Sequence, residues 1–304
     1  MSAAESKRLV LLALAANFGI ALTKFGAAAI SRSSAMLAEA FHSLADTGNQ
    51  LFLLRGEAAA HRGPSVQHPF GTGKERYFWA FMVAVVLFVG GSILSIVNGL
   101  DKIRNADAHE QVGLWLSLGV LAIAALFELL VAFRPAVQEF NRLRAGRSIP
   151  KTIREGRDPA LLIVLFEDSA AVVGLAIAAV GIVLAHLTED ARWDGLASIL
   201  IGLLLAGVAW VIAVEMKALL IGESASREQR ASIRAATLSI PEVEHIDDLL
   251  TMQLSPDQIL VNMDVAFDEG LSEEQVQEAI EAVEAAIRQV VPEATRIFIE
   301  PVDQ

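Results

Sequence analysis

A short stretch of the chain places four polar side chains at helical spacing among apolar ones. Successive members are three, four and three residues apart, and they are Glu39, His42, Asp46 and Asn49. This spacing puts all of them on one face of a helix. An imidazole and a carboxylate one turn apart offer a nitrogen and an oxygen ligand to a single divalent cation. A buried hydrogen-bonded network that only joins helices is the alternative, but two carboxylates on one face favour the cation site.

A second polar site follows more than a hundred residues later. Glu167 and Asp168 are adjacent within Leu165-Phe166-Glu167-Asp168-Ser169-Ala170. Neighbouring residues of a helix are separated by about 100° around its axis. Only one of these two carboxylates is therefore expected to face a cation bound by His42 and Asp46. The alternative is that one of them pairs with a cationic side chain elsewhere.

The segments that carry these groups are long and apolar. About 20 mostly apolar residues are needed to cross the hydrocarbon core of a membrane. Six stretches qualify, approximately 9–30, 35–54, 77–100, 113–133, 159–186 and 195–221. The hydrophobic share of 54% and a mean hydropathy of +0.49 agree with a membrane protein. We therefore predict an α-helical membrane domain of six spans over residues 1–222.

The two polar sites are expected at a similar depth. If the second span runs inward from residue 35, Asp46 lies roughly 16 Å below the outer boundary, given the helical rise. The fifth span runs outward from residue 159, which puts Glu167 about 18 Å below that boundary in a ~30 Å core. Ionisable side chains at such depth usually face each other or a cavity. The predicted cation ligands are His42, Asp46 and one of Glu167 and Asp168, with Glu39, Asn49 and Glu128 as weaker candidates.

Other charged residues within the spans have plainer interpretations. Lys24 and Glu128 are expected to balance buried charge. For Glu128, proton relay is the alternative. Lys217 and Glu215 lie near a span end, from which long side chains reach the interface.

Basic residues in the connecting segments predict the orientation. One side of the membrane receives 13 Lys and Arg residues, including the run from Arg134 to Arg157, and the other side receives 4. Cytoplasmic segments carry the excess of Lys and Arg. Both termini are therefore expected in the cytoplasm, in a multi-pass protein of the inner (plasma) membrane.

The last 82 residues form a different kind of domain. Residues 223–304 contain 18 acidic and 5 basic residues, whereas the preceding body is nearly neutral. Helices at 225–239, capped by Ser224, and at 272–290 are expected with strands at 243–254, 258–267 and 296–300. The order α-β-β-α-β predicts an α+β (ferredoxin-like) domain with its helices on one face of the sheet. The net charge of −12 argues against nucleic acid as a partner.

Several motifs make the chain resemble the cation diffusion facilitator family of zinc and divalent-metal transporters. They are Met36-Leu37-Ala38-Glu39-Ala40 before His42 and Asp46, His68-Pro69-Phe70-Gly71-Thr72-Gly73-Lys74, Asp194-Gly195-Leu196-Ala197-Ser198, and Ile297-Phe298-Ile299-Glu300-Pro301. The likeness covers nearly the whole chain. It implies a homodimer, joined through the cytoplasmic domain, that exports Zn²⁺ in exchange for protons without a cofactor. It also implies metal ligation by His42 and Asp46.

The resemblance is incomplete in the fifth span and in the tail. The family places a second ligand four residues after the first in span five, where Ala171 and Val172 stand here. This resembles a divergent branch with Glu-Asp in that span, which includes mitochondrial zinc transporters. The tail has a single histidine, His245, which we expect to be structural. In relatives a salt bridge joins the loop lysine to the start of the tail, which pairs Lys74 with Glu223.

Two further functions compete with zinc–proton exchange. A carboxylate-rich site accepts harder cations more readily, so transport of Mn²⁺, Fe²⁺ or Co²⁺ is the first alternative. A non-transporting membrane scaffold or sensor, with a partner on its acidic tail, is the second. An enzyme is not expected, because the sequence has no HExxH or nucleophile motif and no cysteine.

Overall fold

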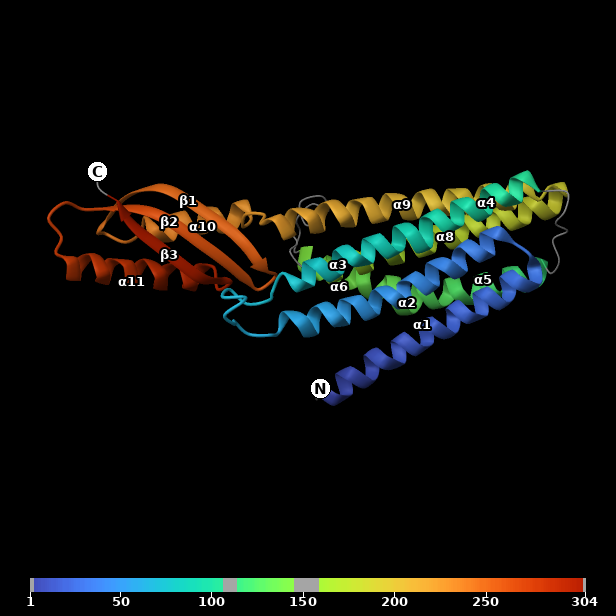
Figure 1. Cartoon of the computed structure of the whole chain (residues 1–304), viewed down its shortest axis with the longest axis horizontal. Coiled ribbons are helices and arrows are strands. Elements are labelled where there is room, and N and C mark those ends of the chain that lie inside the picture. Colours follow the sequence, from blue (N-terminus) through green and yellow to red (C-terminus); the bar gives the residue numbers. More distant parts are fainter. Residues whose placement is uncertain (1–2, 106–113, 145–158, 303–304) are drawn as a thin grey trace. The chain divides into compact units, whose positions relative to one another are not determined.

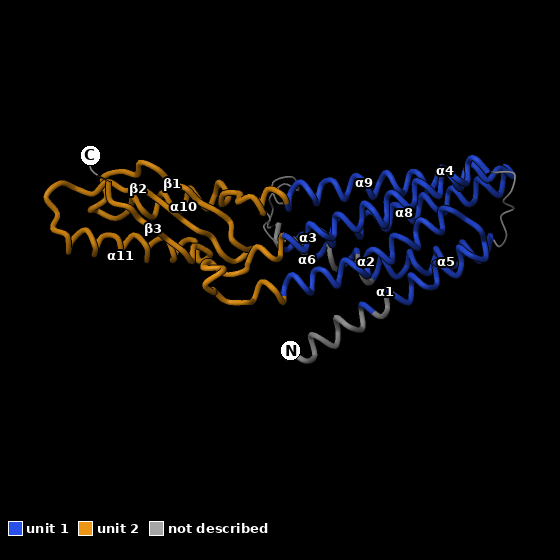
Figure 2. The backbone as a smooth tube through the Cα atoms, viewed as in Figure 1, with its two compact units in different colours: residues 1–57, 78–216 blue, residues 58–77, 217–304 orange. Residues whose placement is uncertain are grey.

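The computed structural model describes residues 3–105, 114–144 and 159–302. The chain divides into two compact units (Figure 2). One comprises Met1–Glu57 and Phe78–Met216, and the other comprises Ala58–Tyr77 and Lys217–Gln304. The second unit thus takes in the segment 58–77 together with the tail. The predicted domain boundary after residue 222 stays a prediction.

The first unit consists of helices, most of which cross its whole length (Figure 1). The helical segments are α1 (Ala3–Ser31), α2 (Ser34–Ala60), α3–η1–α4 (Glu75–Val86, Leu87–Ile93, Leu94–Arg104), α5–η3–α6 (Leu114–Phe127, Glu128–Phe133, Arg134–Arg144), α8 (Pro159–Thr188) and α9 (Arg192–Ile221). Here η1 and η3 are π-helical turns within otherwise α-helical segments. Each of the six predicted apolar stretches overlaps one segment.

Among the described residues, three helical stretches are long and apolar enough to cross a membrane. They are Glu75–Arg104, Ile163–Thr188 and Arg192–Ile221, and Leu114–Leu130 is apolar but shorter. Helix α2 is less apolar because it carries the polar stripe from Glu39 to Asn49. A span that holds ionisable groups is typical of a binding site within a membrane rather than of a simple anchor. Four of the basic residues used to predict orientation (Arg147, Lys151, Arg154 and Arg157) lie outside the described residues.

Small residues let the helices of the first unit approach closely. A Cβ added to Gly99 of α4 would lie 2.5 Å from the carbonyl oxygen of Gly195. One added to Gly195 of α9 would lie 2.8 Å from the carbonyl oxygen of Gly99. The backbones of α4 and α9 therefore touch, which is the packing that small residues permit between membrane helices.

The first turn of α2 is held by a carboxylate from α9. Asp194 is fully buried and accepts hydrogen bonds from Ser33 Oγ (2.5 Å), Ser34 N (2.6 Å), Ser34 Oγ (3.0 Å) and Ala35 N (3.2 Å). Ser33 Oγ accepts in turn from Met36 N at 3.0 Å, as an N-cap does. These bonds satisfy backbone donors that a helix N-terminus leaves open. They also fix where α2, and with it the polar stripe, begins.

The tail has the predicted order of elements. Helix α10 (Arg227–Thr237) precedes β1 (Val243–Ser255), β2 (Gln258–Phe267), α11 (Glu273–Val290) and β3 (Ala294–Val302). Strands β1 and β2 are antiparallel, and β2 and β3 are parallel. Residues Pro256 and Asp257 form the tight connection between paired Ser255 and Gln258. The predicted fold class of the tail is therefore confirmed.

The prediction that Ser224 caps the first tail helix is wrong. Ser226 is the N-cap: its Oγ accepts from Gln229 N at 3.1 Å, and Gln229 Oε1 accepts from Ser226 N at 3.0 Å. The same reciprocal pair, between Ser272 and Gln275, opens α11. Such a capping box needs Gln or Glu three residues after the serine, and Arg227 occupies that place for Ser224.

One core holds the tail together. Alternate residues of β2, namely Ile259, Val261, Met263 and Val265, are fully buried. They share a core with Ile233 of α10 and with Val283 and Ile287 of α11. Both helices therefore cover the same face of the sheet, as predicted. The opposite face stays open, and on it Leu250 and Phe298 are both paired with Asn262 and are about half exposed.

The segment 58–77 packs on the tail within the second unit. A Cβ on Gly73 would lie 2.7 Å from Ser255 Cβ and 2.8 Å from the Leu254 carbonyl oxygen, so the segment contacts the end of β1 directly. Lys74 Nζ donates to the carbonyl oxygen of Leu220 at 3.3 Å. The predicted pairing of Lys74 with Glu223 stays a prediction.

Candidate metal site

The central pair of the polar stripe is formed as the spacing predicts. His42 Nδ1 lies 3.4 Å from Asp46 Oδ1, and the side chain of His42 is 1% exposed while that of Asp46 is 18% exposed. Both ring nitrogens of His42 and Oδ1 of Asp46 are buried and have no hydrogen-bond partner among the described residues. Buried polar atoms are almost always partnered. A nitrogen and a carboxylate oxygen without partners are the kinds of ligand that a divalent cation takes.

Asn49 joins the stripe to the second predicted site. Its Nδ2 donates a hydrogen bond to Glu167 Oε1, and both residues are buried. This bond brings the carboxylate of α8 to the polar face of α2. Asp168 is less buried than Glu167, and its Oδ2 has no hydrogen-bond partner among the described residues. Of the two carboxylates, Glu167 is the one with a hydrogen bond to a residue of the stripe.

The first residue of the stripe is already paired. Lys24 Nζ of α1 lies 3.1 Å from Glu39 Oε2 and donates to Ser43 Oγ at 2.7 Å. The side chains of Lys24 and Glu39 are both 0% exposed. A Cβ on Gly174 of α8 would overlap Glu39 Oε1, so the absence of a side chain there makes room for the carboxylate. Lys24 therefore offsets the charge of Glu39.

Glu128 stands at the start of the π-helical turn η3. It is only partly exposed and interacts electrostatically with Asp46 and Glu167. π-Helical turns within α-helices are frequent at functional sites. The position agrees with either of the interpretations that the sequence left open for Glu128, namely charge balance and proton relay.

The predicted ligands do not form a closed metal cluster in the described part of the chain. No group of three or more His, Asp or Glu side chains there is close enough to hold an ion. His42 and Asp46 form one pair, and Glu167 is linked to it through Asn49. The assignment of His42, Asp46, Glu167 and Asp168 as ligands stays a prediction.

The sequence did not reveal how Lys24 and Asn49 act. The sequence indicates that Lys24 is a charge within a span. Its contacts with Glu39 and Ser43 link α1 to α2, because these partners are 15 and 19 positions away. Asn49, one of the weaker ligand candidates, donates through Nδ2 to Glu167, 118 positions away. Helical periodicity shows which residues share a face, but it does not show which neighbouring helix that face meets.

His245 in the tail lies on the surface. Its Nε2 is 3.0 Å from Asp247 Oδ1, and the two side chains are 48% and 51% exposed. This exposed pair resembles His42 and Asp46 in chemistry but differs from them in burial.

Two family models match the chain. The model of the cation efflux transmembrane domain matches residues 10–221. The model of the cation efflux protein cytoplasmic domain matches residues 225–301. The chain therefore belongs to the cation efflux family.

Individual relatives agree with the family models. Metal tolerance protein C4 of Arabidopsis thaliana is 31% identical over 87% of this chain and 58% of its own length. The human mitochondrial proton-coupled zinc antiporter SLC30A9 is 32% identical over 86% of this chain and 46% of its own length. The zinc transporter ZitB of Escherichia coli is 28% identical over 80% of this chain and 72% of its own length. The chain spans about half the length of the first two relatives.

Family membership confirms the architecture inferred from the sequence. The protein is a multi-pass helical membrane protein with a C-terminal domain that contains a small mixed sheet. The family is one of transporters rather than enzymes, in agreement with the sequence.

Proposed function

We propose that the chain is a divalent cation transporter that exports Zn²⁺ from the cytoplasm in exchange for protons. The observation that carries the proposal is the buried His42–Asp46 pair, whose ring nitrogens and Oδ1 atom have no hydrogen-bond partner among the described residues. Relatives named as zinc transporters, one of them named as proton-coupled, support the choice of cargo.

Metal and protons compete for the same atoms in this proposal. A nitrogen of His42 and the carboxylate of Asp46 bind the cation, and Glu167 or Asp168 completes the site. A metal-binding histidine must be neutral and a metal-binding carboxylate ionised, so loading releases protons. Imidazole titrates near neutral pH. Acidification therefore weakens metal binding, and alternating exposure of the site to the two sides exchanges metal for protons.

Charge balance supports a divalent cation. Lys24 offsets the charge of Glu39 within 3.1 Å. Asp46 and Glu167 then supply two negative charges beside a neutral imidazole. A divalent ion balances that charge, whereas an empty site favours the uptake of protons. Protonation would prevent two carboxylates from facing each other unpaired in a membrane.

The proposed setting is the inner membrane, with both termini in the cytoplasm. The excess of Lys and Arg in the segments on one side supports this orientation. We further propose that the protein acts as a homodimer joined through its cytoplasmic domain, which is the domain matched by the second family model.

A flux assay with a panel of metals tests the proposal. The purified chain in liposomes is given Zn²⁺, Mn²⁺, Co²⁺ or Fe²⁺, with and without a pH gradient. We expect Zn²⁺ uptake that accelerates when protons can leave the liposome lumen in exchange. Faster flux of Mn²⁺, Fe²⁺ or Co²⁺ than of Zn²⁺ would identify that metal as the cargo in place of zinc. No pH-driven flux of any of the four metals would favour the scaffold or sensor instead.

A further inference from the structure

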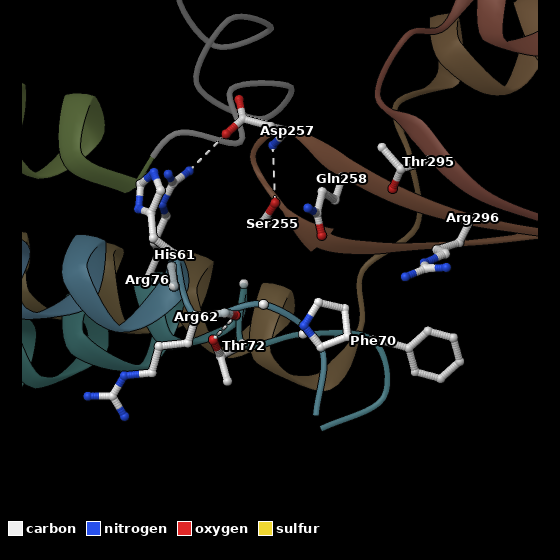
Figure 3. Close-up of a pocket in the computed structure, with 15 residues that line it drawn as sticks. His61, Arg62, Phe70, Thr72, Arg76, Ser255, Asp257, Gln258, Thr295 and Arg296 are labelled. Carbon is white, nitrogen blue, oxygen red and sulfur yellow. Dashed lines mark hydrogen bonds and ion pairs between the residues drawn. The ribbon is translucent and has the colours of Figure 1, made fainter. Parts of the chain in front are cut away.

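A cavity lies within the second unit, away from the polar stripe. It measures about 460 Å³ and is formed by the segment 58–77, the turn between β1 and β2, and the first residues of β3. Its size is in the range of sites for small molecules or head groups, roughly 300–1,000 Å³. All of its lining residues lie in one compact unit. Figure 3 shows the cavity with these residues as sticks.

The lining is basic although the tail as a whole is acidic. The lining contains three arginines, Arg62, Arg76 and Arg296, and one carboxylate, Asp257. Arg76 Nη1 lies 3.0 Å from Asp257 Oδ2, and this ion pair is the dashed line between them in Figure 3. Asp257 therefore offsets Arg76 and leaves two positive charges.

Arg62 and Arg296 have no such partner. Both side chains are exposed, and neither makes a hydrogen bond or ion pair with another described residue. They come from opposite walls, the 58–77 segment and β3, and their guanidinium groups lie at opposite ends of the view in Figure 3. Guanidinium groups bind phosphate oxygens through paired charge-assisted hydrogen bonds.

The walls are fixed by interactions that leave these two arginines available. Thr72 Oγ1 donates to the carbonyl oxygens of Ala59 (2.8 Å) and Arg62 (2.9 Å), which closes the loop after α2. Ser255 Oγ accepts from Asp257 N at 3.3 Å, which shapes the opposite turn. The cavity is thus preformed, which lowers the entropy cost of binding.

We propose that this cavity binds an anionic phosphate group. The sequence favours a lipid head group as its source. Arg62 follows the end of α2 by two residues, and Arg76 lies in the first turn of α3. Both helices continue into predicted spans, so the loop is expected at head-group depth. Basic pockets next to membrane helices bind anionic head groups. Free phosphate is the other source with the same chemistry.

Titration of the full-length protein with two probes tests the site. The protein in nonionic detergent is titrated by calorimetry with short-chain phosphatidylglycerol, with phosphatidylcholine of equal chain length as the reference, and separately with inorganic phosphate. The double variant R62Q/R296Q removes both unpaired charges. The control R227Q/R234Q removes two exposed arginines of α10, outside the cavity, and changes net charge equally.

We expect saturable phosphatidylglycerol binding that is about tenfold weaker in R62Q/R296Q and unchanged in R227Q/R234Q. The protein could instead bind inorganic phosphate but not the lipid, with weaker binding in R62Q/R296Q and unchanged binding in R227Q/R234Q. That result also supports the site and identifies a soluble ligand. Equal binding by the two double variants, or binding of neither probe to the wild type, overturns the proposal. If the ligand-free R62Q/R296Q variant melts at a lower temperature than the wild type, the single variant R296Q is compared with R234Q instead. Weaker binding in R296Q than in R234Q then supports the proposal, and equal binding overturns it.

Discussion

At the scale of single residues, pairing with Lys24 separates the stripe into two parts with different roles. Lys24 is paired with Glu39 Oε2 and Ser43 Oγ, whereas both ring nitrogens of His42 and Oδ1 of Asp46 have no hydrogen-bond partner among the described residues. A buried charge that loses its partner is strongly destabilising. The first part is therefore expected to support the fold, and the second to bind cargo.

The variant Lys24→Met tests the supporting role. It leaves Glu39 buried without its cation, and we expect the free energy of unfolding to fall by about 3 kcal/mol. The double variant K24M/E39Q removes both charges and should recover most of that loss. Thermal unfolding in detergent measures both. If K24M and K24M/E39Q melt at the same temperature, the ion pair does not hold α1 to α2.

At the scale of elements, close packing between α2 and α8 decides where the carboxylates meet. Gly174 leaves room for Glu39, and the bond from Asn49 to Glu167 lies further along the same two helices. Any side chain at position 174 therefore acts on both contacts.

The variant Gly174→Ala tests this packing. Its Cβ would overlap Glu39 Oε1, so Glu39 must turn away from Lys24 or α8 must move away from α2. We expect a lower melting temperature and slower metal transport. Gly207→Ala of α9 is the matched control, because a Cβ there meets no atom within 4 Å. Unchanged melting and transport in G174A would show that the two helices are not in this contact.

The helices and strands were largely predictable from the sequence, but the hydrogen bonds between distant elements were not. Runs of apolar residues located the helical segments, and the strand expected at residues 258–267 is β2. The hydrogen bonds from the start of α2 to Asp194 join residues about 160 positions apart, so no local sequence pattern predicts them. The N-cap at Ser226 was missed for a different reason, since it was detectable locally from Gln229 three residues later.

The candidate site was predictable at one end only. His42 and Asp46 are one turn apart on a single helix, so spacing alone paired them. The partner in span five depends on how α8 is rotated, which the sequence does not specify for two adjacent carboxylates. The bond from Asn49 favours Glu167 as the residue that faces the stripe.

At the scale of the whole molecule, the open face of the tail sheet is the expected contact between two copies. Leu250 and Phe298 are 58% and 50% exposed, and both are in register with Asn262 between them. Large apolar side chains grouped on an exposed sheet are typical of association surfaces.

The variant L250E/F298E tests dimerisation through this face. Charge at the centre of an apolar contact is costly to bury, so we expect the protein to shift from dimer to monomer in light scattering with size exclusion. Leu238→Glu is the control, since Leu238 is 47% exposed and follows α10 on the other side of the sheet. A dimer that persists in L250E/F298E places the interface elsewhere.

The central claim is that His42 and Asp46 bind the transported ion. The most direct test is pH-driven Zn²⁺ flux in liposomes for H42A and D46A, compared with H245A and D247A, which alter the exposed His–Asp pair of the tail. The account predicts flux below about a tenth of the wild-type rate for the first two variants, given the cost of losing a metal ligand, and wild-type flux for the others. Wild-type flux in H42A and D46A would contradict it.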